Sequence, residues 1–97
     1  MEVSLLYFDG CPNWRRTDRD LVELASEFGF HLTRRRVTSV EDAEALEFRG
    51  SPTVLVDGND PFAEEASPVG LACRLYATPD GMRGAPSIAM LRASLSK

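Results

Sequence analysis

Cys11 is the residue in this sequence whose surroundings best suit chemistry. It lies in the turn-forming segment at residues 9–14, DGCPNW, after an apolar run and before an amphipathic helical pattern. At a helix start the first backbone N–H groups lack partners within the helix and the macrodipole adds partial positive charge, so a thiolate is stabilised there. A free cysteine can instead be a small buried hydrophobic residue, but such residues seldom occupy a polar turn. We therefore predict that Cys11 is the N-cap of the helix and a reactive, solvent-accessible thiol.

A strand before Cys11 and a helix after it must position this thiol. Residues 3–8 are apolar at nearly every position, which is typical of a central strand covered on both faces. From Pro12 onward, apolar residues recur at helical spacing until Gly29, a residue suited to end the helix. The sequence therefore predicts a buried strand and a long amphipathic helix, joined by the turn that carries Cys11.

The next segment predicts a second strand and a second helix. Residues 30–37 are β-prone at their ends but carry three consecutive arginines, a pattern that favours an edge strand, here parallel to the first. Ser39 is followed by Glu41 and Asp42, which indicates an N-cap with acidic residues in the first turn of a short helix.

The C-terminal half predicts two strands and a final helix. Residues 52–56 and 71–78 have the composition of strands, and residues 57–70 between them form a long loop. Ser87 then opens a helix with one apolar face, consistent with a terminal helix that docks on the sheet.

This order of elements resembles the thioredoxin-like superfamily, particularly its small glutaredoxin-sized members. The residues that carry the resemblance are Cys11 with its flanks and the Ser51-Pro52 pair at the start of a β-branched strand. The resemblance implies one α/β domain over residues 1–97. It also implies a four-stranded mixed sheet, in the order β-α-β-α-β-β-α, with helices on both faces.

In this family the first cysteine of a Cys-x-x-Cys motif attacks a disulfide and the second resolves the mixed disulfide. By position Cys11 matches the first cysteine, and Trp14 stands where the second would be. Because tryptophan cannot attack sulfur, Cys11 must act either as a monothiol or with another resolving partner. Pro12, Asn13 and Trp14 border the implied substrate site, although we expect Trp14 to pack in the first helical turn rather than to stack on substrate.

The resemblance also implies how the rest of the substrate site is built. The Ser51-Pro52 bond is then cis, the proline lies beside the reactive cysteine, and the backbone of Ser51 pairs with an extended substrate like an added strand. Without the resemblance, an ordinary trans proline at a strand start would be favoured. Asp80 is a candidate for binding the ammonium group of a thiol cofactor, although a simple turn at residues 78–81 also explains it.

The second cysteine has the pattern of a buried strand residue. Cys73 alternates with Leu71, Leu75 and Ala77, which favours burial on one face of a strand. If the third strand begins near Cys11 and the fourth runs back antiparallel, Cys73 lies roughly 15 Å from Cys11 at ~3.4 Å per residue. Since a disulfide needs Cα atoms within about 7 Å of one another, we predict that Cys11 and Cys73 are not bonded.

The composition narrows the classes of function. The length of 97 residues, with 43% hydrophobic and 27% charged residues, suits one folded domain rather than a disordered chain. A net charge of -4 argues against a sequence-independent nucleic-acid binder.

No run approaches the length of a membrane span and the N-terminus lacks the pattern of a secretion signal, so we expect a cytoplasmic protein. Two cysteines and a lone His31 do not supply a structural zinc site, and we expect no metal.

These observations predict a thiol-disulfide oxidoreductase in which Cys11 is the nucleophile and Pro52 shapes the substrate site. The Cys11 thiolate would attack a protein or small-molecule disulfide, and glutathione or another low-molecular-weight thiol would regenerate it, with no cofactor bound. One alternative is a non-catalytic module that holds a peptide at the rim around Ser51 and Cys11. The other is capture of a thiophilic metal by Cys11 and a second thiolate, against which the expected distance to Cys73 counts.

Overall fold

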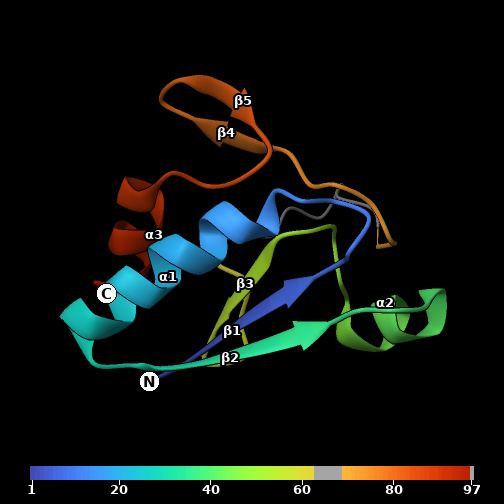
Figure 1. Cartoon of the computed structure of the whole chain (residues 1–97), viewed down its shortest axis with the longest axis horizontal. Helices are drawn as coiled ribbons and strands as arrows, with labels where there is room; N and C mark the ends of the chain where they lie inside the picture. Colours follow the sequence, from blue (N-terminus) through green and yellow to red (C-terminus); the bar gives the residue numbers. More distant parts are fainter. Residues whose placement is uncertain (63–68, 97) are drawn as a thin grey trace.

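The computed structural model describes residues 1–62 and 69–96 of the chain. These residues form an α/β fold in which a three-stranded sheet carries helices and a two-stranded hairpin stands apart from it (Figure 1). In chain order the elements are β1 (Glu2–Tyr7), α1 (Trp14–Phe28), β2 (His31–Arg36), α2 (Val40–Leu46), β3 (Thr53–Val56), β4 (Tyr76–Thr78), β5 (Gly81–Arg83) and α3 (Ile88–Leu95).

β1 is the central strand of the larger sheet, whose order is β2-β1-β3. It pairs in parallel with β2 and antiparallel with β3, so that Leu5 lies opposite Arg34 on one side and Val54 on the other. Buried side chains of β1 alternate between the faces: Val3 and Leu5 belong to one core cluster and Leu6 to another. The predictions of a central first strand and of a parallel, arginine-rich edge strand are both confirmed.

Helices cover both faces of this sheet, as predicted. α1 and α3 lie next to each other on one face (Figure 1) and share the larger core with β1 and β3. α2 packs near one end of the other face, where Ala43 and Phe48 contact Leu6. The buried residues of the larger cluster are Val3, Leu5, Leu21, Leu24, Phe30, Val54, Leu91 and Leu95. Full burial of each leucine contributes roughly 2 kcal/mol, so β1 and the turn that follows it are firmly held.

The start of α1 differs from the prediction. Its N-cap is Asn13 rather than Cys11, and the Asn13 side chain makes no capping hydrogen bond. Cys11 instead closes the turn after β1, because its N–H donates to the carbonyl oxygen of Phe8 at 3.0 Å. The other helix boundaries agree with the sequence: Gly29 ends α1 with φ of 75°, and the Ser39 hydroxyl caps α2 by accepting from the N–H of Asp42.

The strand predicted at residues 71–78 does not join the larger sheet. Only its end forms a strand, β4, and this strand pairs with β5 as a separate hairpin. Before β4, Cys73 makes an isolated parallel bridge with Ser51. The described residues therefore form a sheet of three strands and a sheet of two in place of the four-stranded sheet.

The pattern of burial along residues 71–76 explains this difference. The sequence pattern predicted that Cys73 and Leu75 point inward, but Arg74 and Tyr76 are buried and Leu75 is 66% exposed. Because side chains alternate along an extended chain, burial of Arg74 turns its two neighbours to the opposite side. The predicted inward and outward faces are thus exchanged.

The loop predicted at residues 57–70 lies partly outside the described residues. Its first part turns back directly after β3, where Val56 and Asn59 form an isolated bridge. Among the helices of the described ranges, none combines the length and the hydrophobicity needed to cross a bilayer.

Gly50 lets the chain before β4 approach the start of β3, and this predicts a large effect of Gly50→Ala. Gly50 has φ of 112°, and a Cβ there would lie 2.9 Å from the Cβ of Arg74 and 3.1 Å from the carbonyl oxygen of Ala72. Strain at positive φ and overpacking would act together, so we expect the free energy of unfolding to fall by about 3 kcal/mol.

Gly58→Ala is the matched control, since Gly58 also has positive φ but open space around its Cα. There we expect a loss of about 1 kcal/mol. Urea denaturation measures both variants. Equal losses would show that the chain before β4 does not pack closely on Gly50.

Candidate functional site

Cys11 and Cys73 form a disulfide, and the prediction that they are not bonded is wrong. Their Cα atoms are 5.6 Å apart although 62 positions separate them in the chain, a separation within the usual range for a disulfide. The predicted distance assumed that residues 71–78 form one strand antiparallel to β3. Instead the chain passes Ser51 in a parallel direction, which brings Cys73 beside the turn that carries Cys11.

Two backbone hydrogen bonds hold Cys73 opposite Ser51. The N–H of Ser51 donates to the carbonyl oxygen of Ala72 at 2.8 Å, and the N–H of Arg74 donates to the carbonyl oxygen of Ser51 at 3.0 Å. Both backbone groups of Ser51 are therefore paired with the protein's own chain. The Sγ of Cys11 lies 3.7 Å from the same Ser51 carbonyl oxygen, so the sulfur pair and this bridge form one compact site.

The two cysteines differ in exposure, and in the opposite sense to the prediction. Cys11 was expected to be accessible, but its exposed fraction is 0%. Cys73 was expected to be buried in a strand, but it is exposed. Cys11 is fully buried. Cys73 is on the exposed side of its segment, opposite the buried side chain of Arg74. A reagent from solvent therefore meets Cys73.

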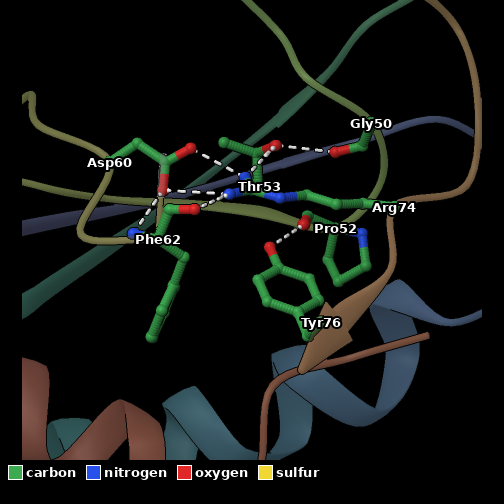
Figure 2. Close-up of polar contacts among 7 residues, drawn as sticks. All are labelled: Gly50, Pro52, Thr53, Asp60, Phe62, Arg74 and Tyr76. Carbon is green, nitrogen blue, oxygen red and sulfur yellow. Dashed lines mark hydrogen bonds and ion pairs between the residues drawn. The ribbon is translucent and has the colours of Figure 1, made fainter. Parts of the chain in front are cut away.

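The side chain next to Cys73 in sequence is buried in a polar network (Figure 2). The guanidinium of Arg74 donates to the Asp60 carboxylate at 2.7 Å, to the carbonyl oxygen of Phe62 at 2.6 Å and to the Thr53 hydroxyl at 3.3 Å. Only 6% of the Arg74 side chain and 12% of the Asp60 side chain are exposed. Arg74 thus connects the segment before β4 to strand β3 and to residues 60–62, which follow β3.

Tyr76 adds a second attachment on the same inward face. Its hydroxyl donates to the carbonyl oxygen of Pro52, and its ring lies beneath the Arg74 guanidinium with 4.7 Å from Cζ to the ring centroid (Figure 2). Burial is the main reason that the pKa of Tyr76 is raised well above its ordinary value. The phenol therefore remains protonated and serves as a hydrogen-bond donor.

The structure confirms two expectations at the predicted site. The Ser51-Pro52 peptide bond is cis, as the resemblance implied, and both residues are buried beside Cys11. Trp14 is a packing residue, because its ring stacks on Tyr7 with 4.2 Å between centroids and contacts the larger core.

The other predicted site residues meet at a neighbouring cavity. Pro12 and Asn13 at the start of α1 and Asp80 at the tip of the β4–β5 hairpin line a cavity of about 400 Å³. Its wall also carries Arg15, Arg16 and Arg83, which sequence reasoning did not assign to the site. Asp80 is exposed, and the arginines make this cavity mainly basic in a protein of net negative charge.

Sequence reasoning also missed Arg74 and Asp60. The one signal for Arg74 is its place among the apolar residues of the segment LACRLY, and this place alone does not identify an acidic partner. Among the described residues, no group of three or more His, Cys, Asp or Glu side chains is placed to hold a metal ion.

Comparison of the chain with protein-family models, with curated proteins and with solved structures found no match.

The burial of the Arg74–Asp60 pair predicts that Asp60→Asn is strongly destabilising. The substitution leaves a buried guanidinium without its counter-charge, so we expect the free energy of unfolding to fall by about 3 kcal/mol. The control is Glu27→Gln, which removes the charge partner of Arg92 at an exposed pair and should change stability little. Chemical denaturation measures the free energy of unfolding of both variants. If Asp60→Asn lost no more than Glu27→Gln, this would contradict a dominant role for the Arg74–Asp60 pair.

Proposed function

We propose that this protein is a thioredoxin-like thiol-disulfide oxidoreductase whose redox couple is Cys11 and Cys73. The observation that carries the proposal is the covalent pairing of Cys11, buried in a strand-to-helix turn, with a cysteine that solvent can reach. A sulfur pair with one accessible member can exchange electrons with thiols and disulfides outside the protein.

The layout of the chain supports the thioredoxin-like part of this proposal. β1 lies between a parallel β2 and an antiparallel β3, helices pack on both faces, and Cys11 lies against Ser51, the residue before Pro52. The chain departs from the family in the place of β4, which pairs outside the larger sheet. It also departs in the motif around Cys11, where Trp14 replaces the second cysteine.

Cys73 supplies the missing second cysteine, and because it is exposed it is the attacking cysteine, with Cys11 as the resolving one. A monothiol mechanism would need an accessible Cys11 sulfur, and burial of Cys11 counts against it. In the oxidised protein, an external thiolate would attack the Sγ of Cys73, and the sulfur–sulfur bond would break with its electron pair leaving on Cys11, which then takes a proton. The product is a mixed disulfide between Cys73 and the external thiol. A second external thiolate attacks the external sulfur of this mixed disulfide and releases a free disulfide and the Cys73 thiolate.

The reverse sequence reduces a disulfide substrate. The Cys73 thiolate attacks one sulfur of the substrate and expels the other as a thiolate, and the Cys11 thiolate then attacks the Sγ of Cys73 and expels the remaining substrate sulfur. The protein loses two electrons and the substrate disulfide becomes two thiols. At Cys11, the Ser51 carbonyl oxygen at 3.7 Å can accept a hydrogen bond from the protonated thiol.

The basic cavity at the start of α1 supports a low-molecular-weight thiol as reductant. Arg15, Arg16 and Arg83 offer guanidinium groups for carboxylates, and Asp80 offers a carboxylate for an ammonium group. Glutathione carries both kinds of group. We therefore propose glutathione, or another thiol of that chemistry, as the reductant, with protein or small-molecule disulfides as substrates.

Cysteine variants test the proposed function. In the reduced protein, limiting iodoacetamide followed by peptide mass spectrometry should modify Cys73 before Cys11, because only Cys73 is exposed. In a disulfide-reduction assay with glutathione, Cys73→Ser and Cys11→Ser should each lose at least about tenfold in rate. The double variant provides the baseline. Full activity of Cys73→Ser would show that Cys11 works alone, and full activity of both single variants would exclude the couple.

Binding of a peptide at the rim around Ser51, the alternative from the sequence, finds less support. The N–H and the carbonyl oxygen of Ser51 are both bonded to residues of the same chain. An incoming strand would have to displace that segment before it could pair there.

The proximity of the two sulfurs favours a second candidate function, capture of a soft metal ion such as Cu(I). The expected separation counted against it, and the 5.6 Å between Cα atoms removes that objection. Two thiolates without further ligands in the described ranges suit a two-coordinate ion rather than tetrahedral zinc.

Competition with dithiothreitol for Cu(I) tests this candidate in the reduced protein. A metal-capture protein should hold one ion more tightly than dithiothreitol does and lose it on either Cys→Ser substitution. Binding no tighter than that of dithiothreitol would contradict metal capture and leave the redox function.

A further inference from the structure

The segment that carries Cys73 is attached to the protein by contacts that do not involve its sulfur. Arg74 is anchored to Asp60, Thr53 and Phe62, and Tyr76 is anchored to Pro52 (Figure 2). The two hydrogen bonds to the backbone of Ser51 lie on the same segment. Reduction of the disulfide leaves all of these groups chemically unchanged.

Detaching the segment would be costly even when the disulfide is reduced. Arg74 and Asp60 have 6% and 12% of their side chains exposed, so separating them would leave charged groups in a poorly solvated place unless both moved into water. The close packing of Gly50 against Ala72 and Arg74 would also be lost. Cys73 is an exposed residue, so an external thiol can reach it without moving the anchors.

We infer that Arg74 is a positioning residue that, through Asp60, holds Cys73 against Cys11 in the dithiol state as well as in the disulfide state. The inference rests on the proposed function for the identity of the redox couple. Its consequence is that the edge at Ser51 stays occupied by residues 72–74 throughout the cycle. The site then takes disulfides that approach Cys73 from solvent, and it excludes extended peptides that would pair with Ser51.

A pre-positioned Cys73 accelerates the step that closes the cycle. In the mixed disulfide of Cys73 and a substrate sulfur, the Cys11 thiolate attacks the Sγ of Cys73, and the substrate sulfur leaves as a thiolate. Because both sulfurs already lie within reach, little conformational freedom is lost on forming the new bond. A Cys73 on a loose loop would have to find Cys11 by diffusion of the loop.

Hydrogen exchange of the reduced wild-type protein tests the inference without any variant. The amide protons of Ser51 and Arg74 are the donors of the two bridging hydrogen bonds. We expect both to exchange in the reduced protein within about threefold of their rates in the oxidised protein. Exchange at the rate of free, solvated amides after reduction would overturn the inference, since it would show that the segment detaches.

A redox equilibrium tests the role of Arg74 itself. The protein is equilibrated in a glutathione redox buffer. The fraction of protein that carries the Cys11–Cys73 disulfide then gives the effective concentration of the Cys11 thiol at the Cys73 thiol. We expect Arg74→Gln to lower this effective concentration by about tenfold or more. Arg92→Gln, which removes an arginine from an exposed ion pair, is the matched control and should leave it unchanged. An Arg74→Gln protein that folds and keeps the wild-type value would contradict the inference.

The two proposals fail in distinguishable ways. If the protein does not turn over disulfide substrates but Arg74→Gln still lowers the effective concentration, the proposed function is wrong and the positioning role stands. If turnover depends on both cysteines but the amides of Ser51 and Arg74 lose protection on reduction, the redox function stands and the positioning role is wrong. A Cys11→Ser, Cys73→Ser background measures how far Arg74→Gln alters folding stability alone, which separates that effect from the redox equilibrium.

Discussion

The guanidinium of Arg74 is almost fully buried. Hydrogen bonds to Asp60, Phe62 and Thr53 take the place of those it would make with water. A buried charge is tolerated only where such partners surround it, and the pair then specifies one arrangement more than it adds stability. Here the arrangement specified is the orientation of a whole segment. Because Arg74 faces inward, Tyr76 does so too and reaches Pro52, while Cys73 and Leu75 turn the other way.

That orientation decides the chemistry open to the two sulfurs. Cys11 is fully buried, whereas Cys73 lies at the surface, so a molecule in solvent reaches Cys73 first. In the proposed redox couple, the Cys73 sulfur would receive the external partner and the Cys11 sulfur would break or re-form the internal bond. Trp14, which stands where a resolving cysteine would be expected, is free to pack against Tyr7 and the core.

The backbone of Ser51 links this chemistry to the fold. Its N–H and carbonyl groups lie at the start of β3 and are used by Ala72 and Arg74, so the chain supplies its own neighbouring strand at the place where the family resemblance implied an external one. Gly50, just before it, gives the room for that approach. The basic cavity at the start of α1 has a different set of lining residues, which includes none of those that form this edge.

Much of the frame follows from local patterns in the sequence. The apolar run of β1, the helical periodicity ended by Gly29 and the cap at Ser39 each concern neighbouring residues, and the structure has all three. That Cys11 lies beside the Ser51-Pro52 pair was implied by the family resemblance and not by a local pattern, and the structure places the Cys11 Sγ against Ser51. The start of α1 was misplaced by two residues, because the turn after β1 closes on Cys11 before the helix begins.

The partner of Cys11 was decided by tertiary structure alone. In the segment around Cys73 the apolar pattern favoured one face for burial, and only the contact of Arg74 with Asp60, 14 positions away, selects the other. An ion pair of this kind leaves no periodic signal in either segment, because its energy depends on burial that exists only once β3 and the core are assembled. The sequence by itself thus determined the elements from β1 to β3 and the position of the first sulfur in the turn after β1. The packed structure determined the course of residues 71–78, which sulfur Cys11 meets and which of the two cysteines reaches solvent.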